Sequence, residues 1–397
     1  MTPGRRRRLG PESLVLVAFF LSTCGQAIIR PASTYRALEL GAGVREVGLI
    51  VAAYSAVAVV FAIPVGRRVD RTGTRQGIVL GSLLLAVSAA GSAYGTNLAM
   101  LAATMAVGGV AHVYVMLSAQ AFAASAGSTT DRRRQFARNS VANSLGQIVG
   151  PLLLGWSVSV SHGMSVRSTV ELAFLLTAGI GVLAAVLGGV LGRVGAAPVD
   201  KQDDLSFGLI AQLVGRRGMS PALAAGITIV VAQDILVAYL PLIGTAANLS
   251  PATVGVLLSL RGIASLLSRL WMMSILRRLG LRVVLVLTMV APAAAMAALV
   301  WSHALWQFVV PIAVFGFFVG IGTPLTASWV AQLSPEHLRA TTLGLRISGN
   351  RLGQTFIPIG LGAVGAATGV GAVFLAPALA LFVCGCWIVS GDLGAES

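Results

Sequence analysis

The stretch Gly66-Arg67-Arg68-Val69-Asp70-Arg71-Thr72-Gly73-Thr74-Arg75 joins two apolar runs, residues 47–65 and 77–94. Each run has about the 18 to 20 apolar residues that an α-helix needs to cross a bilayer. Glycine permits a sharp turn of the backbone, and arginines favour the aqueous headgroup region. The stretch therefore predicts two membrane helices that are joined by a short basic turn.

The composition of the whole chain is that of a membrane protein. Of its 397 residues, 56% are hydrophobic and only 10% are charged, a balance that soluble globular domains do not need. Apolar segments recur along the chain and predict an all-α protein with twelve transmembrane helices. The predicted spans are residues 13–35, 46–65, 76–95, 98–124, 137–160, 169–192, 220–244, 252–275, 282–301, 305–331, 341–366 and 369–390.

The arginines and lysines concentrate in alternate loops between these segments. With both termini in the cytoplasm, 20 of the 28 fall in cytoplasmic segments, and only Arg36, Arg45 and Arg167 fall in outer loops. This bias predicts a multi-pass protein of the inner (plasma) membrane with both termini cytoplasmic. Because topology accounts for the net charge of +15, we expect the lipid bilayer as a partner and no nucleic acid.

An internal repeat at a constant offset of 207 residues predicts two related halves. The matched pairs include Gln26/Gln233, Gly48/Gly255, Arg71/Arg278, Gly73/Gly280, Gly109/Gly316, Asn143/Asn350, Gly146/Gly353, Gln147/Gln354 and Pro151/Pro358. The predicted halves are residues 1–193 and 218–397, each a bundle of six helices, with a cytoplasmic linker at 194–217. Since six is an even number, the halves should be related by an axis along the membrane normal.

The basic turn and the repeat together resemble the transporters of the major facilitator superfamily. The spacing Gly-x-x-x-Asp-Arg-x-Gly-x-Arg is similar to that family's loop between helices 2 and 3, and the resemblance covers essentially the whole chain. It implies a cytoplasmic gating motif, consisting of Gly66, Asp70, Arg71, Gly73 and Arg75. The second half has Arg277 where the first has Asp70. The second copy of the motif therefore either forms another gate or only carries positive charge that fixes the orientation in the membrane.

A second motif lies in the predicted span 137–160. Its residues Gly146, Gly150, Pro151 and Gly155 resemble a motif of proton-coupled drug antiporters in this superfamily. Two departures weaken that resemblance: Leu154 replaces a further glycine, and Met105 stands where such exporters carry an arginine. The alternative interpretation is close packing, because glycines four residues apart let helices approach each other.

Asp234 is the only acid near the middle of a predicted span. Ionisable groups at that depth are expensive and usually functional. The candidate counter-charges are Arg30, Arg261 and Arg351. Asp234 either carries protons during transport or forms a static ion pair that locks helices together.

Polar and aromatic residues within apolar spans predict a substrate cavity, although ordinary helix packing would also explain each of them. They are Gln26, Tyr54, His112, Tyr114, Gln233, Tyr239 and Phe315.

The resemblance implies a secondary active transporter that moves a small amphipathic or hydrophobic compound across the inner membrane by proton-coupled efflux. Uptake or facilitated transport of a small metabolite is the alternative. A receptor or a membrane enzyme would be a different class, but no nucleophile–base pair or metal-ligand pattern supports an enzyme. We expect a monomer with no metal and no cofactor.

Overall fold

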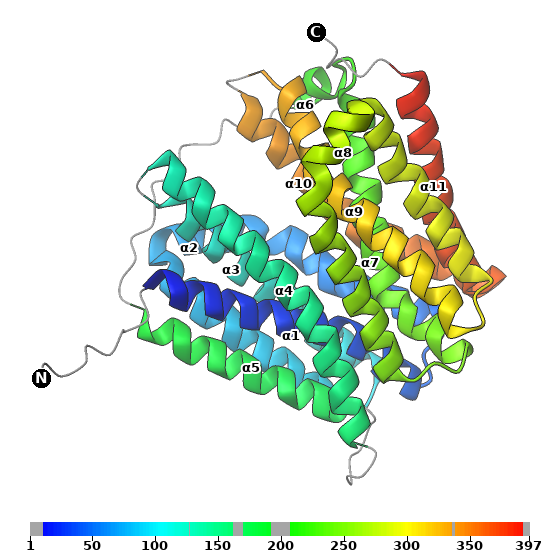
Figure 1. Ribbon diagram of the computed structural model, residues 1–397. Helices are drawn as coiled ribbons and strands as arrows, with labels where there is room; N and C mark the ends of the chain where they lie inside the picture. The colour runs from blue at the N-terminus through cyan, green and yellow to red at the C-terminus, as the bar shows by residue number, and fades with distance from the viewer. Residues whose placement is uncertain (1–10, 127, 162–169, 192–206, 336–337, 392–397) are drawn as a thin grey trace, which may run out of the picture.

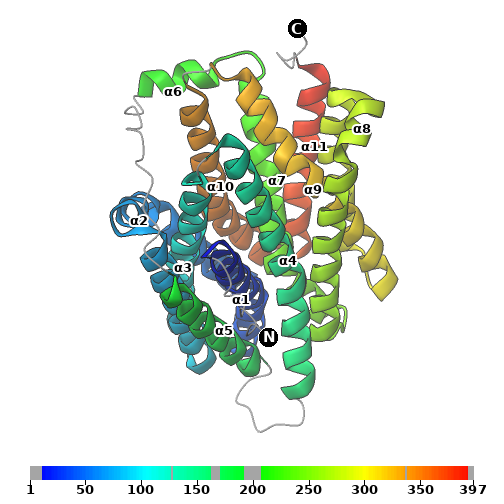
Figure 2. The same ribbon diagram turned by 60° about the vertical axis from the view of Figure 1, so that its left-hand side comes forward.

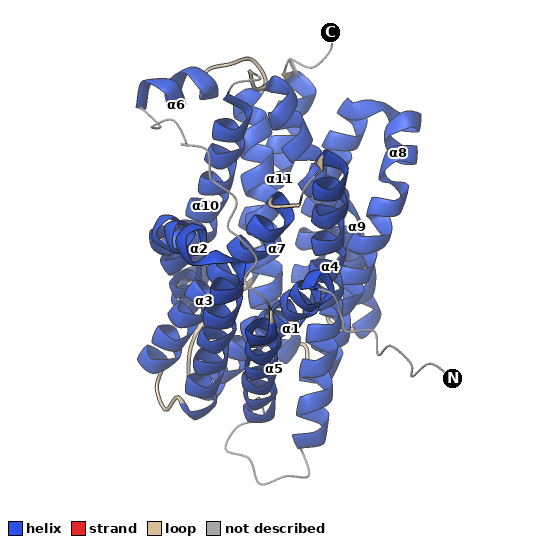
Figure 3. Cartoon of the chain, turned by 90° about the vertical axis from the view of Figure 1, so that its left-hand side faces the viewer, coloured by secondary structure: helices blue, strands red, loops and turns tan. Residues whose placement is uncertain are grey.

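The computed structural model describes residues 11–126, 128–161, 170–191, 207–335 and 338–391, which form helices and no strands (Figure 3). The helices are α1 (Pro11–Glu39), α2 (Val44–Tyr94), α3 (Leu98–Ala124), α4 (Thr129–Ser161), α5 (Glu171–Val190), α6 (Phe207–Val214), α7 (Met219–Ala246), α8 (Pro251–Val300), α9 (Leu305–Leu333), α10 (Arg339–Thr368) and α11 (Gly371–Ser390).

Two of these helices, α2 and α8, each consist of two membrane-length segments that meet at a sharp kink. The kink of α2 lies at Gly73, with φ 82° and ψ 166°, and that of α8 lies at Gly280, with φ 78° and ψ 161°. Only glycine adopts this backbone conformation readily. The predicted turn is therefore present, and it is made by Gly73 of the basic stretch rather than by Gly66, which is helical.

Nine helices within the described residues are long and apolar enough to cross a membrane: α1 to α5, α7 to α9 and α11. Each of the twelve predicted spans falls on one of the helices, with two spans on α2 and two on α8. The predicted span 341–366 lies in α10, which is not among these nine helices and carries Arg346 and Arg351 in its first half. The all-α membrane fold is confirmed, and the count of twelve crossings stays a prediction.

The helices form two bundles, α1 to α5 and α7 to α11 (Figures 1 and 2). The offset of 207 residues recurs in their boundaries. The first residues of α2 and α8, Val44 and Pro251, are 207 apart, and so are those of α3 and α9. The offset falls to 200 between α5 and α11, because the connection before α11 is shorter.

Contacts between the bundles repeat the same symmetry. A Cβ added at Gly48 of α2 would lie 2.6 Å from the carbonyl oxygen of Pro358 in α10, and one at Gly255 of α8 would overlap that of Pro151 in α4. These two crossings are related by the 207-residue offset. In Figure 1 the bundles converge toward the lower right and diverge toward the upper left.

The predicted linker, 194–217, lies partly outside the described residues. Its described part contains the short helix α6, which lies at the end of the molecule where α11 ends (Figures 1 and 2). The boundaries of the two halves stay a prediction.

Candidate functional site

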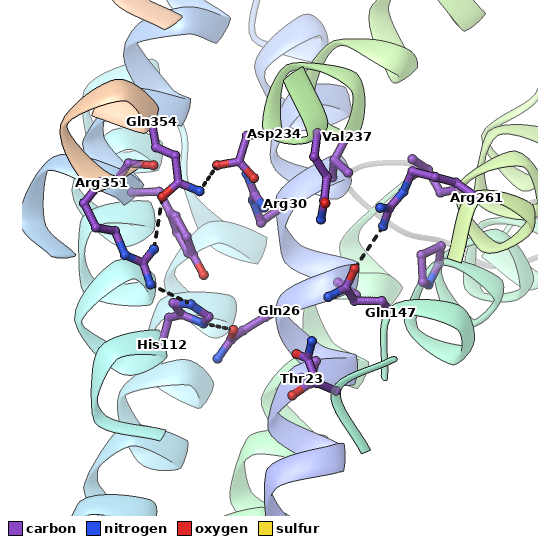
Figure 4. A pocket seen from close by; sticks show the side chains of 17 residues that line it. Thr23, Gln26, Arg30, His112, Gln147, Asp234, Val237, Arg261, Arg351 and Gln354 are labelled. Carbon is purple, nitrogen blue, oxygen red and sulfur yellow. Dashed lines mark hydrogen bonds and ion pairs between the residues drawn. The ribbon is translucent and has the colours of Figure 1, made fainter. Parts of the chain in front are cut away.

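A cavity of about 110 Å³ lies between the two bundles and takes side chains from both of them (Figure 4). Its lining comes from α1, α2, α3 and α4 of the first bundle and from α7, α8 and α10 of the second. The charged and strongly polar lining residues are Gln26, Arg30, His112, Asn143, Gln147, Gln233, Asp234, Arg261, Arg351 and Gln354.

Asp234 of α7 is buried and pairs with Arg30 of α1, with 2.9 Å between Oδ1 and Nη2. The other carboxylate oxygen accepts a hydrogen bond from Nε2 of Gln354 at 2.5 Å. The guanidinium carbon of Arg30 also lies 5.5 Å from the ring centre of Tyr54, a cation–π distance. Of the three predicted counter-charges, Arg30 is therefore the ion-pair partner of Asp234.

His112 of α3 contacts a residue at each ring nitrogen. Its Nδ1 contacts Oε1 of Gln26, and its Nε2 lies 3.5 Å from Nη2 of Arg351. Since a guanidinium only donates and an amide oxygen only accepts, both contacts are satisfied by a neutral imidazole with its proton on Nδ1. His112 thus presents a lone pair to Arg351 and adds no charge to the cavity.

Arg261 of α8 is only 4% exposed. Its Nη2 donates to Oε1 of Gln147 at 3.1 Å, while its Nε is buried and has no hydrogen-bond partner among the residues that the structure describes. Figure 4 shows Arg261 and Arg351 on opposite sides of the group that includes Gln26 and Arg30.

Three polar contacts across the cavity join one bundle to the other. Arg30 and Asp234 connect α1 to α7, Arg261 and Gln147 connect α8 to α4, and Arg351 and His112 connect α10 to α3. Relative movement of the bundles at this level would therefore break all three.

The glycines of the predicted packing motif bring α4 close to its neighbours. A Cβ at Gly146 or Gly150 would collide with atoms of Thr23, Cys24 or Ala27 in α1, and one at Gly155 would lie 3.0 Å from Ala252 of α8. Together with Pro151, these residues let α4 lie close to both helices, and α4 supplies Asn143 and Gln147 to the cavity.

The seven predicted substrate residues divide into two groups. Gln26, Tyr54, His112 and Gln233 line the cavity, whereas Tyr114, Tyr239 and Phe315 do not. Tyr114 packs beside Gly81 within the first bundle, and Phe315 is fully buried in the core. Tyr239 lies between the bundles, where its hydroxyl donates to the backbone oxygen of Val44 at 3.5 Å.

The gating motif lies apart from the cavity. Asp70 is partly exposed and forms no ion pair with any residue that the structure describes. Near the other ends of the helices the bundles meet, and the hydroxyl of Thr34 donates to the backbone oxygen of Ala238 at 2.8 Å. On the gating side of the cavity, Nη1 of Arg269 in α8 donates to the hydroxyl of Ser144 in α4 at 3.0 Å. The close contacts near the outer ends are those expected of a conformation closed on the predicted outer side.

Several polar lining residues were not predicted to lie in the cavity, among them Thr23, Ser55, Asn143, Gln147 and Gln354. A signal for two of them was present: Gln147 and Gln354 are identical polar residues at repeat-related positions in apolar helices, as Gln26 and Gln233 are. Within the described residues, no three histidine, cysteine or acidic side chains gather in a way that would hold a metal ion.

Comparison with known proteins places these features in a family. The family model of the Major Facilitator Superfamily matches residues 15–247 and 222–392. The structure of the nucleoside transporter NupG is similar over 96% of this chain and 99% of that one, with a TM-score of 0.80 and 14% sequence identity.

Two curated relatives match part of the sequence. The Multidrug resistance protein 1 of Bacillus subtilis is 27% identical over 175 residues, which is 44% of this chain and 43% of that protein. The Quinolone resistance protein NorA of Staphylococcus aureus is 26% identical over 172 residues, which is 43% of this chain and 42% of that protein. The chain thus spans under half the length of the curated relatives it matches.

Proposed function

Because the chain belongs to the major facilitator superfamily, we propose that it is a secondary active transporter of a small amphipathic molecule. The observation that carries the proposal is the central cavity, whose three polar contacts each join one bundle to the other. A site built from two bodies is alternately exposed when those bodies rock about it.

The contacts near the predicted outer ends define one of the two states of this cycle. The bundles meet closely at Gly48 with Pro358 and at Gly255 with Pro151, while Asp70 on the opposite side is free of ion pairs among the described residues. In the other state the outer contacts open, and Asp70 helps to hold the cytoplasmic ends together.

We assign proton coupling to Asp234. Its carboxylate is 5% exposed and is held by Arg30 of the opposite bundle. Protonation of Asp234 removes the negative charge, so the ion pair across the bundles is lost. Gain or loss of one proton thereby changes how strongly the bundles hold each other at the cavity.

Export from the cell is the direction that we propose. Two relatives are named for drug resistance, and a transporter protects a cell from a drug by carrying it outwards. The charge bias of the loops favours the inner membrane with both termini cytoplasmic. A single chain is the transporting unit in this proposal, because both bundles that line the cavity belong to one chain.

Uptake of a small metabolite is the second candidate function. The observation that favours it is Met105, which is 2% exposed within the core and occupies the position where exporters of this type carry an arginine. If that arginine is needed for proton antiport, its replacement by a thioether favours a different coupling.

The purified full chain in proteoliposomes tests the proposal. Counterflow of a labelled compound, compared with protein-free liposomes, should reveal exchange through the cavity, and an imposed pH gradient should drive its accumulation. Expression in a drug-sensitive bacterium separates the directions, because export raises resistance and uptake raises sensitivity. If a broad panel of compounds shows no protein-dependent flux, the transporter assignment is refuted.

A further inference from the structure

The charged residues that line the cavity do not balance. Arg30, Arg261 and Arg351 contribute three positive charges, and Asp234 contributes one negative charge. The neutral imidazole of His112 adds none, so the formal charge of the lining that the structure describes is +2. This excess lies at the centre of a protein whose surroundings are a bilayer, where an unbalanced charge is expensive.

Two of the three arginines carry the excess. Arg30 has the carboxylate of Asp234, whereas neither Arg261 nor Arg351 has a carboxylate within 4 Å among the described residues. Arg261 has one amide oxygen, and Arg351 has long contacts of 3.4 Å to Gln354 and 3.5 Å to His112. Neutral partners orient a guanidinium but do not cancel its charge.

We propose that the cavity binds a small organic anion whose negative charge is balanced by Arg261 and Arg351. A carboxylate, phosphate or sulfate group fits the planar fork of a guanidinium, which can donate two parallel hydrogen bonds to it. Arg261 lines the cavity, and its buried Nε has no hydrogen-bond partner among the residues that the structure describes, so it is one such donor. A cationic substrate would meet two unbalanced positive charges.

The size of the cavity is consistent with a compact ligand. Its volume of about 110 Å³ is below the roughly 300–1,000 Å³ of most sites for drug-sized molecules. Ala27, Pro151, Val237 and Leu258 give the lining an apolar part beside its charges. The anion we infer therefore has a charged head and a short apolar body. The inference rests on the proposed function only in taking this cavity as the substrate site.

Three probes of similar size test the sign of the charge: benzoate, benzamide and benzylammonium, with phenyl phosphate as a second anion. Each is added to the purified full chain at millimolar concentration, and the melting temperature is measured. A ligand that binds the folded state raises that temperature, and benzoate or phenyl phosphate should raise it by on the order of 2 °C. Benzylammonium should leave it unchanged.

Variants then locate the site. Arg261→Gln and Arg351→Gln should each lower the affinity for the anionic probe by about tenfold or more. Arg346→Gln is the matched control, because Arg346 is a buried arginine of α10 that does not line the cavity and bonds instead to Thr323 and Thr326. If Arg261→Gln does not fold, Arg261→Lys keeps the charge but not the fork, and should bind with intermediate affinity.

Three results would overturn the proposal: stabilisation by benzylammonium equal to that by benzoate, no stabilisation by either anion, or anion binding that survives both cavity substitutions. Flux in proteoliposomes separates this from the proposed function. Protein-dependent flux of cations alone would refute the anion site and leave transport standing. Anion binding that depends on Arg261 and Arg351, without flux of any compound, would support the anion site and refute transport.

Discussion

Asp234→Asn separates a proton carrier from a static ion pair. Asparagine has nearly the shape of the protonated acid, and its amide oxygen can still accept the hydrogen bond from Gln354. What the substitution removes is the charge that faces Nη2 of Arg30 at 2.9 Å. If Asp234 carries protons, transport driven by a pH gradient should fail, while exchange of substrate, which requires no change in protonation, should continue.

If Asp234 instead forms a static ion pair with Arg30, the loss of stability on substitution can be worked out from that pair. Removing one partner of a buried ion pair costs about 3–5 kcal/mol. The side chains of Arg30 and Asp234 are 21% and 8% exposed, and Arg30 keeps its contact with Tyr54, so the lower end of that range applies. A static pair therefore predicts a loss of about 3 kcal/mol, with exchange, driven flux and melting temperature falling together.

The assay compares exchange and pH-driven flux in the same proteoliposomes, with the melting temperature measured alongside. Glu46→Gln is a suitable control, because Glu46 lies outside the cavity and its side-chain oxygen accepts from the backbone of Gly43, a bond that glutamine can keep. Undiminished pH-driven flux in Asp234→Asn would exclude Asp234 as the obligatory proton carrier.

Other substitutions test the gate, the crossing of the bundles and the kink. Asp70→Asn should slow transport at normal membrane levels, as measured by flux and immunoblotting; unchanged flux would remove Asp70 from the mechanism. Gly255→Ala should lower stability by about 1–3 kcal/mol, because its Cβ would overlap the carbonyl oxygen of Pro151; an unchanged melting temperature would contradict this crossing. Gly73→Ala should destabilise by about 1–3 kcal/mol, since φ is 82° there, whereas Gly179→Ala, with open space around its Cβ, is the neutral control in the same melting assay.

The helices and their pairing into halves could be predicted because both depend on local or repeated patterns. Apolar runs locate membrane helices, and the repeat that matches Gly73 with Gly280 agrees with two kinks of nearly the same backbone angles. The residues of the cavity were harder to predict. Where a helix is apolar on all sides, as around Tyr239, its sequence does not indicate which face turns inward.

The sequence also does not show which arginine pairs with Asp234 in the cavity. Arg30, Arg261 and Arg351 were equal candidates for Asp234, and only the packing of α1 against α7 brings Arg30 within 2.9 Å. The long separation of the two residues in the chain leaves no local pattern to read. The repeat-related glutamines, Gln147 and Gln354, show that a comparison of the halves could have found part of the lining.

If the bundles rock against each other as proposed, the paired crossings at Gly48 with Pro358 and Gly255 with Pro151 would serve as the fulcrum. With a rise of about 1.5 Å per residue, a helix such as α1, 29 residues long, is a lever of about 44 Å. A rotation of about 10° at one end then displaces the other by about 8 Å, whereas the cavity, which Pro151 itself lines, lies beside this fulcrum and moves less. Since a hydrogen bond tolerates a few tenths of an ångström, Arg30, Arg261 and Arg351 would lose their partners in the opposite bundle almost simultaneously. On the proposed function, a change of state would then break these three contacts together rather than one after another.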